Sequence, residues 1–400
     1  MDNRKTCRIE SRKENDGRRI MLKEEFNDKN YLLEKAKKFR VQGNPIDVEI
    51  LESGHINKTY KIIYDDFGEN KEYILQYVNT DIFPKLEELM LNIKNITEYI
   101  RKKANENEED LDRITLMMMD TIDNNMYSIC DENWRMEKFI QNTKTFLTTD
   151  DLNILYESGK AIGKFQKYLD GFDTSNLNEI IPKFHHTPNR LNQLIEALSN
   201  EENKQKRHER FSRAKESIDF LLDGKRTEKT YIIINMLESG KIPYRVTHND
   251  AKLSNILFDK NTNKSVCLID LDTVMPGALA YDFGEGVRTS ISLAEEDEQD
   301  LSKVIVNLDR FEAFTKGFLE GMKYVVTKEE RNTLLLGTWM MTYENALRFM
   351  ADYLNGDIYF NVNKDIEDHN LYRAKVQIEI LKQIEQNEEK LIEIVKKYGI

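Results

Sequence analysis

The most informative part of this chain is the segment Arg245-Val-Thr-His-Asn-Asp-Ala-Lys-Leu-Ser-Asn-Ile-Leu-Phe-Asp259, followed by Val266-Cys-Leu-Ile-Asp-Leu-Asp272. It places Asp250, Asn255 and Asp270 in the order H-x-D-x4-N … I-D. Phosphoryl transfer needs this set of groups, because its transition state mainly requires neutralised charge and aligned oxygens. A lone H-x-D pattern arises often by chance, whereas the complete string in front of a hairpin is specific.

The hairpin is predicted from two short apolar runs, Ile256–Phe258 and Val266–Ile269. They flank the turn-prone stretch Lys260–Lys264 and are typical of paired strands. A hairpin returns the end of its second strand to the loop that precedes the first strand. We therefore expect the three polar side chains to converge.

Each of these side chains has a predicted role. Asp250 is the catalytic residue and contacts the substrate, because its carboxylate can orient the attacking hydroxyl towards the γ-phosphorus. Asn255 and Asp270 are the metal ligands, and the metal is one or two Mg²⁺ ions bound with the nucleotide. For His248, a structural hydrogen bond within the loop is favoured over proton transfer.

The sequence that follows adds further candidates. Asp272 follows Asp270 by two residues, so on a strand both face the same side, and Asp272 becomes a possible further metal or phosphate ligand. Asp282 is predicted to anchor the loop through backbone hydrogen bonds. Gly277 and Gly284 are predicted to lie in turns.

Composition points to a cytoplasmic enzyme. The 400 residues suffice for two lobes with a core, and a net charge of −12 argues against nucleic acid as a partner. No apolar run is long enough to cross a bilayer, and the polar N-terminus lacks a signal-peptide core. Three widely spaced cysteines, Cys7, Cys130 and Cys267, predict neither disulfides nor structural zinc. No obligate protein partner is evident.

The expected fold class is α+β with two lobes. Residues 1–27 form a polar extension, 28–140 a β-rich, nucleotide-binding N-lobe, and 141–400 a mostly helical C-lobe that carries the catalytic loop. Alternating apolar positions predict strands at Thr59–Tyr64 and Tyr73–Val78, and helical periodicity predicts a helix at Leu86–Lys103.

The catalytic string resembles that of the aminoglycoside phosphotransferase and choline kinase superfamily, and most closely that of the bacterial N-acetylhexosamine 1-kinases. The resemblance spans roughly residues 46 to 382. Besides the catalytic string, the stretches that carry it are Gly54-His-Ile-Asn57, Tyr73-Ile-Leu-Gln76, Phe184-His-His-Thr-Pro-Asn-Arg190, Ile269-Asp-Leu-Asp-Thr-Val-Met-Pro-Gly277, Tyr281-Asp-Phe-Gly284 and Arg348-Phe-Met-Ala-Asp-Tyr-Leu-Asn-Gly-Asp-Ile-Tyr-Phe360.

The resemblance implies a bilobal protein-kinase-like fold and an enzyme that uses ATP and Mg²⁺ to phosphorylate the anomeric C1 hydroxyl of an N-acetylhexosamine. It implies that Gly54 and Asn57 belong to a nucleotide-binding loop and that His55 contacts the substrate. The alternative for this segment is an ordinary hairpin turn. Backbone groups near Glu137 and Phe139 would hold the adenine.

At one position the chain departs from the superfamily. The strand that usually presents a lysine to the α- and β-phosphates ends here in Gln76, which donates a hydrogen bond but carries no charge. The hexosamine kinases resemble this pattern. Lys138 and the metal ions are possible replacements for the missing charge.

The acceptor site is expected on the C-terminal helices. The resemblance assigns substrate contacts to Arg348 and Tyr359. Because Arg348 and Asp352 are four residues apart on a predicted helix, a surface ion pair is the alternative for Arg348. Phe184–Arg190 shares the family pattern and is either functional or structural.

Two other functions stay open at this point. One is a related kinase of choline, an aminoglycoside or another small alcohol. The other, from a different class, is a catalytically weak nucleotide-binding regulatory protein. Gln76 supports the latter, and the intact set of Asp250, Asn255 and Asp270 argues against it.

Overall fold

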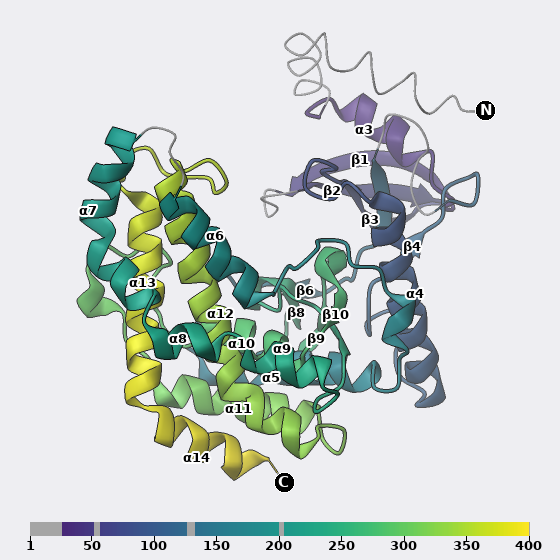
Figure 1. Ribbon diagram of the computed structural model, residues 1–400. Coiled ribbons are helices and arrows are strands. Elements are labelled where there is room, and N and C mark those ends of the chain that lie inside the picture. Colours follow the sequence, from purple (N-terminus) through teal and green to yellow (C-terminus); the bar gives the residue numbers. More distant parts are fainter. Residues whose placement is uncertain (1–25, 52–56, 126–132, 200–203, 400) are drawn as a thin grey trace, which may run out of the picture. The chain divides into compact units, whose positions relative to one another are not determined.

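The computed structural model describes residues 26–51, 57–125, 133–199 and 204–399. The chain divides into two compact units, Met1–Met90 with Leu116–Gln141, and Leu91–Thr115 with Asn142–Ile400. The first contains a β-sheet and the second is mostly helical, so the fold class is α+β as predicted (Figure 1). Most of the predicted extension, residues 1–25, lies outside the described residues.

The first unit is built on a five-stranded antiparallel sheet in the order β1-β2-β3-β5-β4. Its elements are α3 (Lys29–Ala36), β1 (Asn44–Leu51), β2 (Lys58–Asp66), β3 (Glu69–Tyr77), β4 (Met118–Met119) and β5 (Trp134–Lys138). Both predicted strands are confirmed, as β2 and β3. A two-residue turn, Phe67-Gly68, joins them with positive φ at both positions, as a tight hairpin requires.

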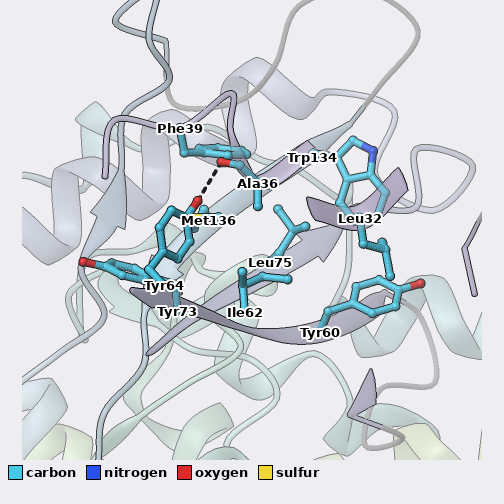
Figure 2. Packing of buried hydrophobic residues seen from close by; sticks show 10 residues of the cluster. All are labelled: Leu32, Ala36, Phe39, Tyr60, Ile62, Tyr64, Tyr73, Leu75, Trp134 and Met136. Carbon is cyan, nitrogen blue, oxygen red and sulfur yellow. Dashed lines mark hydrogen bonds between the residues drawn. The ribbon is translucent and has the colours of Figure 1, made fainter. Parts of the chain in front are cut away.

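One face of this sheet is apolar because alternate residues of each strand point to it. Tyr60 and Ile62 of β2, Leu75 of β3 and Trp134 of β5 are all buried there beneath α3. Figure 2 shows this cluster, in which the Tyr64 hydroxyl donates to the carbonyl oxygen of Ala36 at 2.8 Å. The opposite face therefore carries the polar positions of the same strands.

The long helix α4 (Leu86–Glu106) confirms the helix predicted at Leu86–Lys103. It begins in the first unit and continues into the second. None of the described helices combines the length and the apolar composition that a membrane span requires.

The second unit has two small sheets, with strand orders β6-β8-β9 and β10-β7. Its strands are β6 (Thr143–Lys144), β7 (Arg245–Thr247), β8 (Ile256–Asp259), β9 (Ser265–Leu268) and β10 (Met275–Gly277). Its helices are α5 (Leu152–Tyr168), α6 (Thr187–Ser199), α7 (Lys204–Leu221), α8 (Gly224–Lys229), α9 (Ile232–Glu238), α10 (Leu279–Arg288), α11 (Leu308–Gly321), α12 (Lys328–Asn355), α13 (His369–Gln386) and α14 (Glu388–Tyr398). Short 3-10 turns lie at Thr174–Asn176, Leu253–Asn255, Leu271–Thr273 and Leu301–Lys303.

Helix α12 is the centre of this unit and is buried along most of its length. It crosses α10 so closely that a Cβ on Gly284 would lie 2.3 Å from the carbonyl oxygen of Gly337. The predictions of turns at Gly277 and Gly284 are therefore wrong: Gly277 is the last residue of strand β10, and Gly284 lies inside a helix and allows the close crossing. The same crossing fixes Asp282, two residues earlier on α10.

Candidate active site

The loop between β7 and β8 contains the predicted catalytic residues, and Asp282 holds its backbone. The Asp282 carboxylate accepts hydrogen bonds from the backbone N–H groups of His248 at 2.9 Å and Asn249 at 2.8 Å. It also accepts one from Gln166 Nε2 at 2.6 Å. Burial raises the pKa of this carboxyl, while the three donors favour its ionised form. The predicted anchoring role of Asp282 is confirmed.

His248 is likewise structural, as predicted. Its Nδ1 accepts from the Asp250 backbone N–H at 3.3 Å, so its Nε2 carries the proton that is donated to the Ile269 carbonyl oxygen at 3.0 Å. The side chain is completely buried. It connects the loop to the end of the hairpin and is not placed to transfer a proton.

Asp250 and Asn255 are in direct contact. Asn255 Nδ2 donates to both the backbone oxygen and Oδ2 of Asp250, each at 2.9 Å. Because the amide nitrogen is used in this way, Oδ1 of Asn255 is the atom that can bind a cation. The backbone oxygen of Asn255 accepts from Ile269 N at 2.9 Å, which brings the preceding loop next to Asp270. The predicted hairpin is thus confirmed by β8 and β9.

Asp270 follows β9 in a left-handed conformation, with φ of 62° and ψ of 59°. A non-glycine residue adopts this region at a cost of roughly 1–3 kcal/mol, and such strain gathers at functional sites. The side chain of Asp270 is exposed, whereas Asp272 is 3% exposed. The prediction that both point the same way is wrong, because the chain forms a 3-10 turn here and not a strand.

Lys252 is a site residue that sequence reasoning missed. Its Nζ lies 2.8 Å from Asp250 Oδ2 and forms an ion pair with it. Burial alone would lower the pKa of Lys252, but the negative charges of Asp250, Asp270 and Glu285 raise it. The signal was present in the sequence, as a lysine two residues after the aspartate that is predicted to be catalytic.

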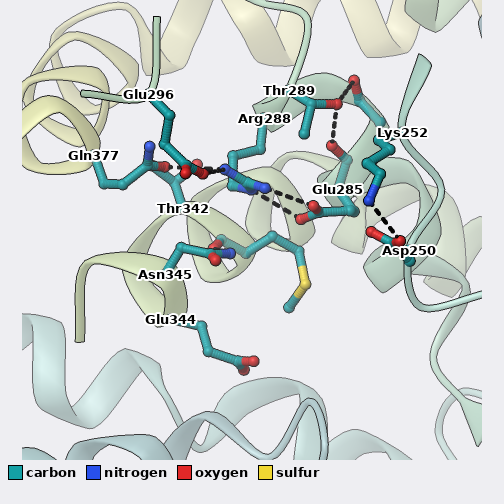
Figure 3. Close-up of polar contacts among 12 residues, drawn as sticks. Asp250, Lys252, Glu285, Arg288, Thr289, Glu296, Thr342, Glu344, Asn345 and Gln377 are labelled. Carbon is teal, nitrogen blue, oxygen red and sulfur yellow. Dashed lines mark hydrogen bonds and ion pairs between the residues drawn. The ribbon is translucent and has the colours of Figure 1, made fainter. Parts of the chain in front are cut away.

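Helix α10 ends in a buried ion pair close to these residues. Arg288 donates from Nε and Nη2 to the two carboxylate oxygens of Glu285 at 2.8 and 2.6 Å. The charge of Glu285 raises the pKa of Arg288 despite burial. Figure 3 shows this pair together with Lys252 and Asp250. Charges of both signs are therefore held in fixed positions beside Asp250.

The predicted acceptor residues come together at the end of α12. The Arg348 guanidinium lies 6.0 Å from the ring centroids of Phe184 and Tyr359, and 5.3 Å from that of Phe360. Tyr359 is 72% exposed, so its ring is accessible to a ligand. Planar donors beside an aromatic surface suit a small polar molecule.

Asp352 shapes this region without pairing with Arg348. Its carboxylate accepts from the backbone N–H groups of Ile358 at 3.0 Å, Tyr359 at 2.8 Å and Phe360 at 3.0 Å. The carboxylate therefore fixes the loop that presents Tyr359. The alternative of a surface ion pair with Arg348 is wrong, because Asp352 is buried and its oxygens bind these amides.

The Phe184–Arg190 segment contacts the catalytic loop. His185 Nδ1 lies 2.9 Å from Glu344 Oε1, and its Nε2 lies 2.9 Å from the carbonyl oxygen of Asn249. Burial and the charge of Arg348 lower the pKa of Arg190. The segment thus joins the acceptor residues to the loop that carries Asp250.

In the first unit, Gln76 lies opposite Arg135 on the neighbouring strand. Gln76 Oε1 accepts from Arg135 Nε at 3.0 Å, and Gln76 Nε2 donates to Thr59 Oγ1 at 3.1 Å. A guanidinium therefore lies beside the position where a lysine would be expected. Sequence reasoning missed it because the register of β3 and β5 was unknown.

The structure describes some of the other residues that are predicted to bind the nucleotide. Asn57 Oδ1 accepts from the Asn79 backbone N–H at 3.0 Å and so joins the start of β2 to the segment after β3. Glu137 lies on β5, and the backbone N–H of Phe139 already donates to the Glu72 carbonyl oxygen at 3.2 Å. The other two predicted contacts, Gly54 and His55, lie outside the described residues.

Comparisons with known proteins agree with this geometry. Residues 144–311 match the model of a family described as the phosphotransferase enzyme family. The chain is similar in structure to an ethanolamine kinase of Plasmodium vivax, with a TM-score of 0.50 and 15% identity, over 83% of this chain and 82% of that one. It is also similar to an aminoglycoside phosphotransferase of Alicyclobacillus acidocaldarius, with a TM-score of 0.51 and 12% identity, over 91% and 95% of the two chains.

At these identities the two structures establish the fold, which is the predicted kinase-like one. The family match covers the catalytic loop, the hairpin and α10, which are the elements that hold Asp250, Asn255, Asp270 and Asp282. The comparisons support a phosphotransferase and do not single out a hexosamine as its acceptor. Residues 144–311, less than half of the chain, are therefore similar to the phosphotransferase enzyme family.

Proposed function

We propose that the protein uses ATP and Mg²⁺ to phosphorylate the anomeric C1 hydroxyl of an N-acetylhexosamine, which gives the sugar 1-phosphate. The observation that carries the phosphotransfer is the direct contact of Asp250 with Asn255, beside the chain that leads into Asp270. These are the base and the metal ligands that the reaction needs, in one continuous loop and hairpin.

The role of Asp250 follows from its contacts. Its carboxylate accepts a hydrogen bond from the acceptor hydroxyl and orients the oxygen towards the γ-phosphorus. Asn255 Nδ2 and Lys252 Nζ both bind Oδ2, so the carboxylate is fixed before the acceptor arrives. Because Lys252 carries a positive charge, it also offsets charge that develops on the transferred group.

The donor set fits magnesium. Mg²⁺ is usually held by one or two carboxylate or amide oxygens together with substrate phosphates, and it keeps several waters. Asn255 Oδ1 and Asp270 supply two such oxygens, and in the described part of the chain no cluster of three His, Cys, Asp or Glu residues forms a closed metal cage. Asn255 and Asp270 would hold the ion, which would supply positive charge against the phosphates.

Nucleotide binding is assigned to the first unit. Gly54 and Asn57 would cover the phosphates, and backbone groups near Glu137 and Phe139 would hold the adenine. Gln76 would donate to a phosphate oxygen, with the Arg135 charge beside it.

The acceptor assignment rests on Arg348 and Tyr359, with His55 as a further contact. A guanidinium presents several donors in a rigid fork, which suits adjacent ring oxygens, and the exposed ring of Tyr359 offers a flat surface. A kinase of an amino alcohol or of an aminoglycoside is the alternative, because the chain is similar in fold to an ethanolamine kinase and to an aminoglycoside phosphotransferase.

The product identifies the reaction. We expect ADP release when the enzyme is incubated with ATP, Mg²⁺ and N-acetylglucosamine or N-acetylgalactosamine. Phosphorus and proton NMR of the product should show a phosphate coupled to the anomeric proton. A 6-phosphate would refute the regiochemistry, while turnover only with choline, ethanolamine or an aminoglycoside would refute the acceptor class. If none of these acceptors supports ADP release, a nucleotide-binding protein without kinase activity would be the better description.

Arg348→Ala should damage sugar affinity far more than ATP affinity. The substitution removes the planar donors from the acceptor residues and leaves the catalytic loop intact, so the KM for the sugar should rise by about 10-fold or more, as for a lost charged hydrogen bond. Steady-state kinetics with each substrate varied in turn measure the effect.

Arg331→Ala is the matched control for this substitution. Arg331 lies on the same helix, α12, where it contacts the Gly399 carbonyl, and it is roughly 25 Å along the helix axis from Arg348. The substitution Arg331→Ala should leave the KM for the sugar and the KM for ATP unchanged. Equal effects of the two substitutions on the sugar KM would show that helix stability, and not acceptor binding, explains the result.

A further inference from the structure

His185 lies between two groups that can only accept hydrogen bonds. Its Nδ1 is 2.9 Å from the Glu344 carboxylate and its Nε2 is 2.9 Å from the Asn249 carbonyl oxygen. A neutral imidazole has one donor nitrogen and one acceptor nitrogen, whereas the imidazolium has two donors. With Glu344 ionised, both contacts can be hydrogen bonds only if both ring nitrogens carry protons, which makes His185 positively charged.

The surroundings of His185 favour that charge. The Glu344 side chain is 1% exposed and that of His185 is 6% exposed, so water screens their attraction weakly. Burial works against the imidazolium, but Glu344, the Asn249 carbonyl and Glu285 together raise the pKa of His185. Groups facing this pair from other elements are Tyr281 of α10, whose ring centroid is 5.5 Å away, and Arg190 of α6, whose Nε is 4.0 Å from Glu344.

The carbonyl that His185 binds belongs to the residue before Asp250. Asn249 has a left-handed backbone with φ of 65°. Its N–H is bound by Asp282 and its side-chain Nδ2 donates to the Thr273 carbonyl oxygen at 2.8 Å. The bond from His185 holds the carbonyl side of this peptide, and the N–H of the same peptide donates to His248 Nδ1 at 3.3 Å. Together these bonds orient the backbone from which the Asp250 side chain extends.

We propose that His185 is a positioning residue for the catalytic loop: its imidazolium, maintained by Glu344, holds the Asn249 carbonyl and thereby aims Asp250 at the acceptor. When His185 loses its second proton to solvent, only one of its two contacts can remain a hydrogen bond. If the bond to the Asn249 carbonyl is lost, Asp282 still holds the N–H groups of the loop, but the Asn249–Asp250 peptide loses one of the contacts that orient it. This inference rests on the proposed phosphotransfer through Asp250.

The protonation state can be observed directly. Nitrogen-15 NMR of the histidine ring nitrogens, with the His185 signal assigned by its loss in His185→Gln, should show both nitrogens protonated at neutral pH. The chain has six histidines, so the assignment by difference is practicable. A neutral ring at pH 7 would overturn the inference.

Kinetics then test the consequence. The kcat of the wild type should fall at alkaline pH with the midpoint found for His185 by NMR, and Glu344→Gln should move both midpoints to lower pH together. His185→Gln should lower kcat by about 10-fold to 10²-fold, the cost of a small misplacement, with little change in the KM for ATP. His186→Gln is the matched control, because His186 Nδ1 accepts from Asn189 N and its replacement should leave kcat unchanged.

The pH dependence of the free energy of unfolding provides an independent test. The pKa of His185 is higher in the folded state than its ordinary value of 6.5. The stabilisation from its proton is therefore complete below pH 6.5 and is lost as pH rises through the folded-state pKa. The difference in unfolding free energy between the wild type and His185→Gln should shrink over that interval.

The outcomes separate this inference from the proposed function. An alkaline midpoint that stays in place in Glu344→Gln while the NMR midpoint moves would overturn the positioning role and leave phosphotransfer through Asp250 intact. Full activity of Asp250→Asn would instead overturn the proposed function.

Discussion

Replacement of Asp250 by asparagine is expected to lower turnover by about 10²-fold or more, the usual contribution of a general base, while nucleotide affinity largely survives. The amide preserves the size of the side chain but loses the charged acceptor. It also breaks the ion pair with Lys252 Nζ at 2.8 Å, so the hydroxyl loses its orienting partner and the loop loses a charge contact. Steady-state kcat and calorimetric binding of ADP measure the two quantities separately.

Asp259→Asn provides the matched control. Asp259 ends β8 of the same hairpin, where it pairs with Arg113 at 3.0 Å and receives hydrogen bonds from the following turn. The same chemical change there should leave kcat unchanged. Wild-type turnover in Asp250→Asn, or an equal loss in both variants, would remove Asp250 from the mechanism.

The catalytic hairpin was predictable because its determinants are local. The two strands and their turn lie within one short segment, and the return of β9 to the loop follows from that geometry alone. Asn255 and Asp250 are close in sequence, so their contact required no tertiary information. The anchoring role of Asp282 was predictable from the motif, although its exact donors were not.

Other parts of the site depend on long-range packing. His185 and Asn249 are 64 residues apart in sequence, and Gln76 and Arg135 are 59 apart. Their pairing depends on the position of α6 and on the register of β3 with β5, which no local pattern encodes. Arg135 was therefore missed, and the Phe184–Arg190 segment could not be assigned.

Gly284 and Asp352 show why some of the predictions failed. Gly284 was expected in a turn, but its lack of a Cβ serves the crossing of α10 and α12. Asp352 was considered for an ion pair because of its helical spacing from Arg348. The carboxylate instead accepts hydrogen bonds from the backbone amides that follow the helix, which leaves it no free oxygen to pair with Arg348.

Asp270→Ala is expected to abolish magnesium-dependent activity, because the substitution removes one of the two side-chain oxygens that are proposed to bind the metal. Asp270 is exposed, so removal of its side chain should cost little packing energy. Its left-handed backbone, with φ of 62°, makes alanine unfavourable by roughly 1–2 kcal/mol. Activity titrated with MgCl₂ and thermal unfolding measure these two effects.

Asp270→Gly separates strain from metal binding. Glycine adopts the left-handed region freely, so this variant should recover stability relative to Asp270→Ala and still be inactive. In Asp270→Asn, the asparagine can adopt the same left-handed conformation, and its side-chain carbonyl oxygen can still bind the metal but carries no charge. Any residual activity of this variant should therefore require more magnesium. If Asp270→Gly were active at ordinary magnesium concentrations, the strained backbone and not the carboxylate would explain the loss in Asp270→Ala, and the metal site would have to lie elsewhere.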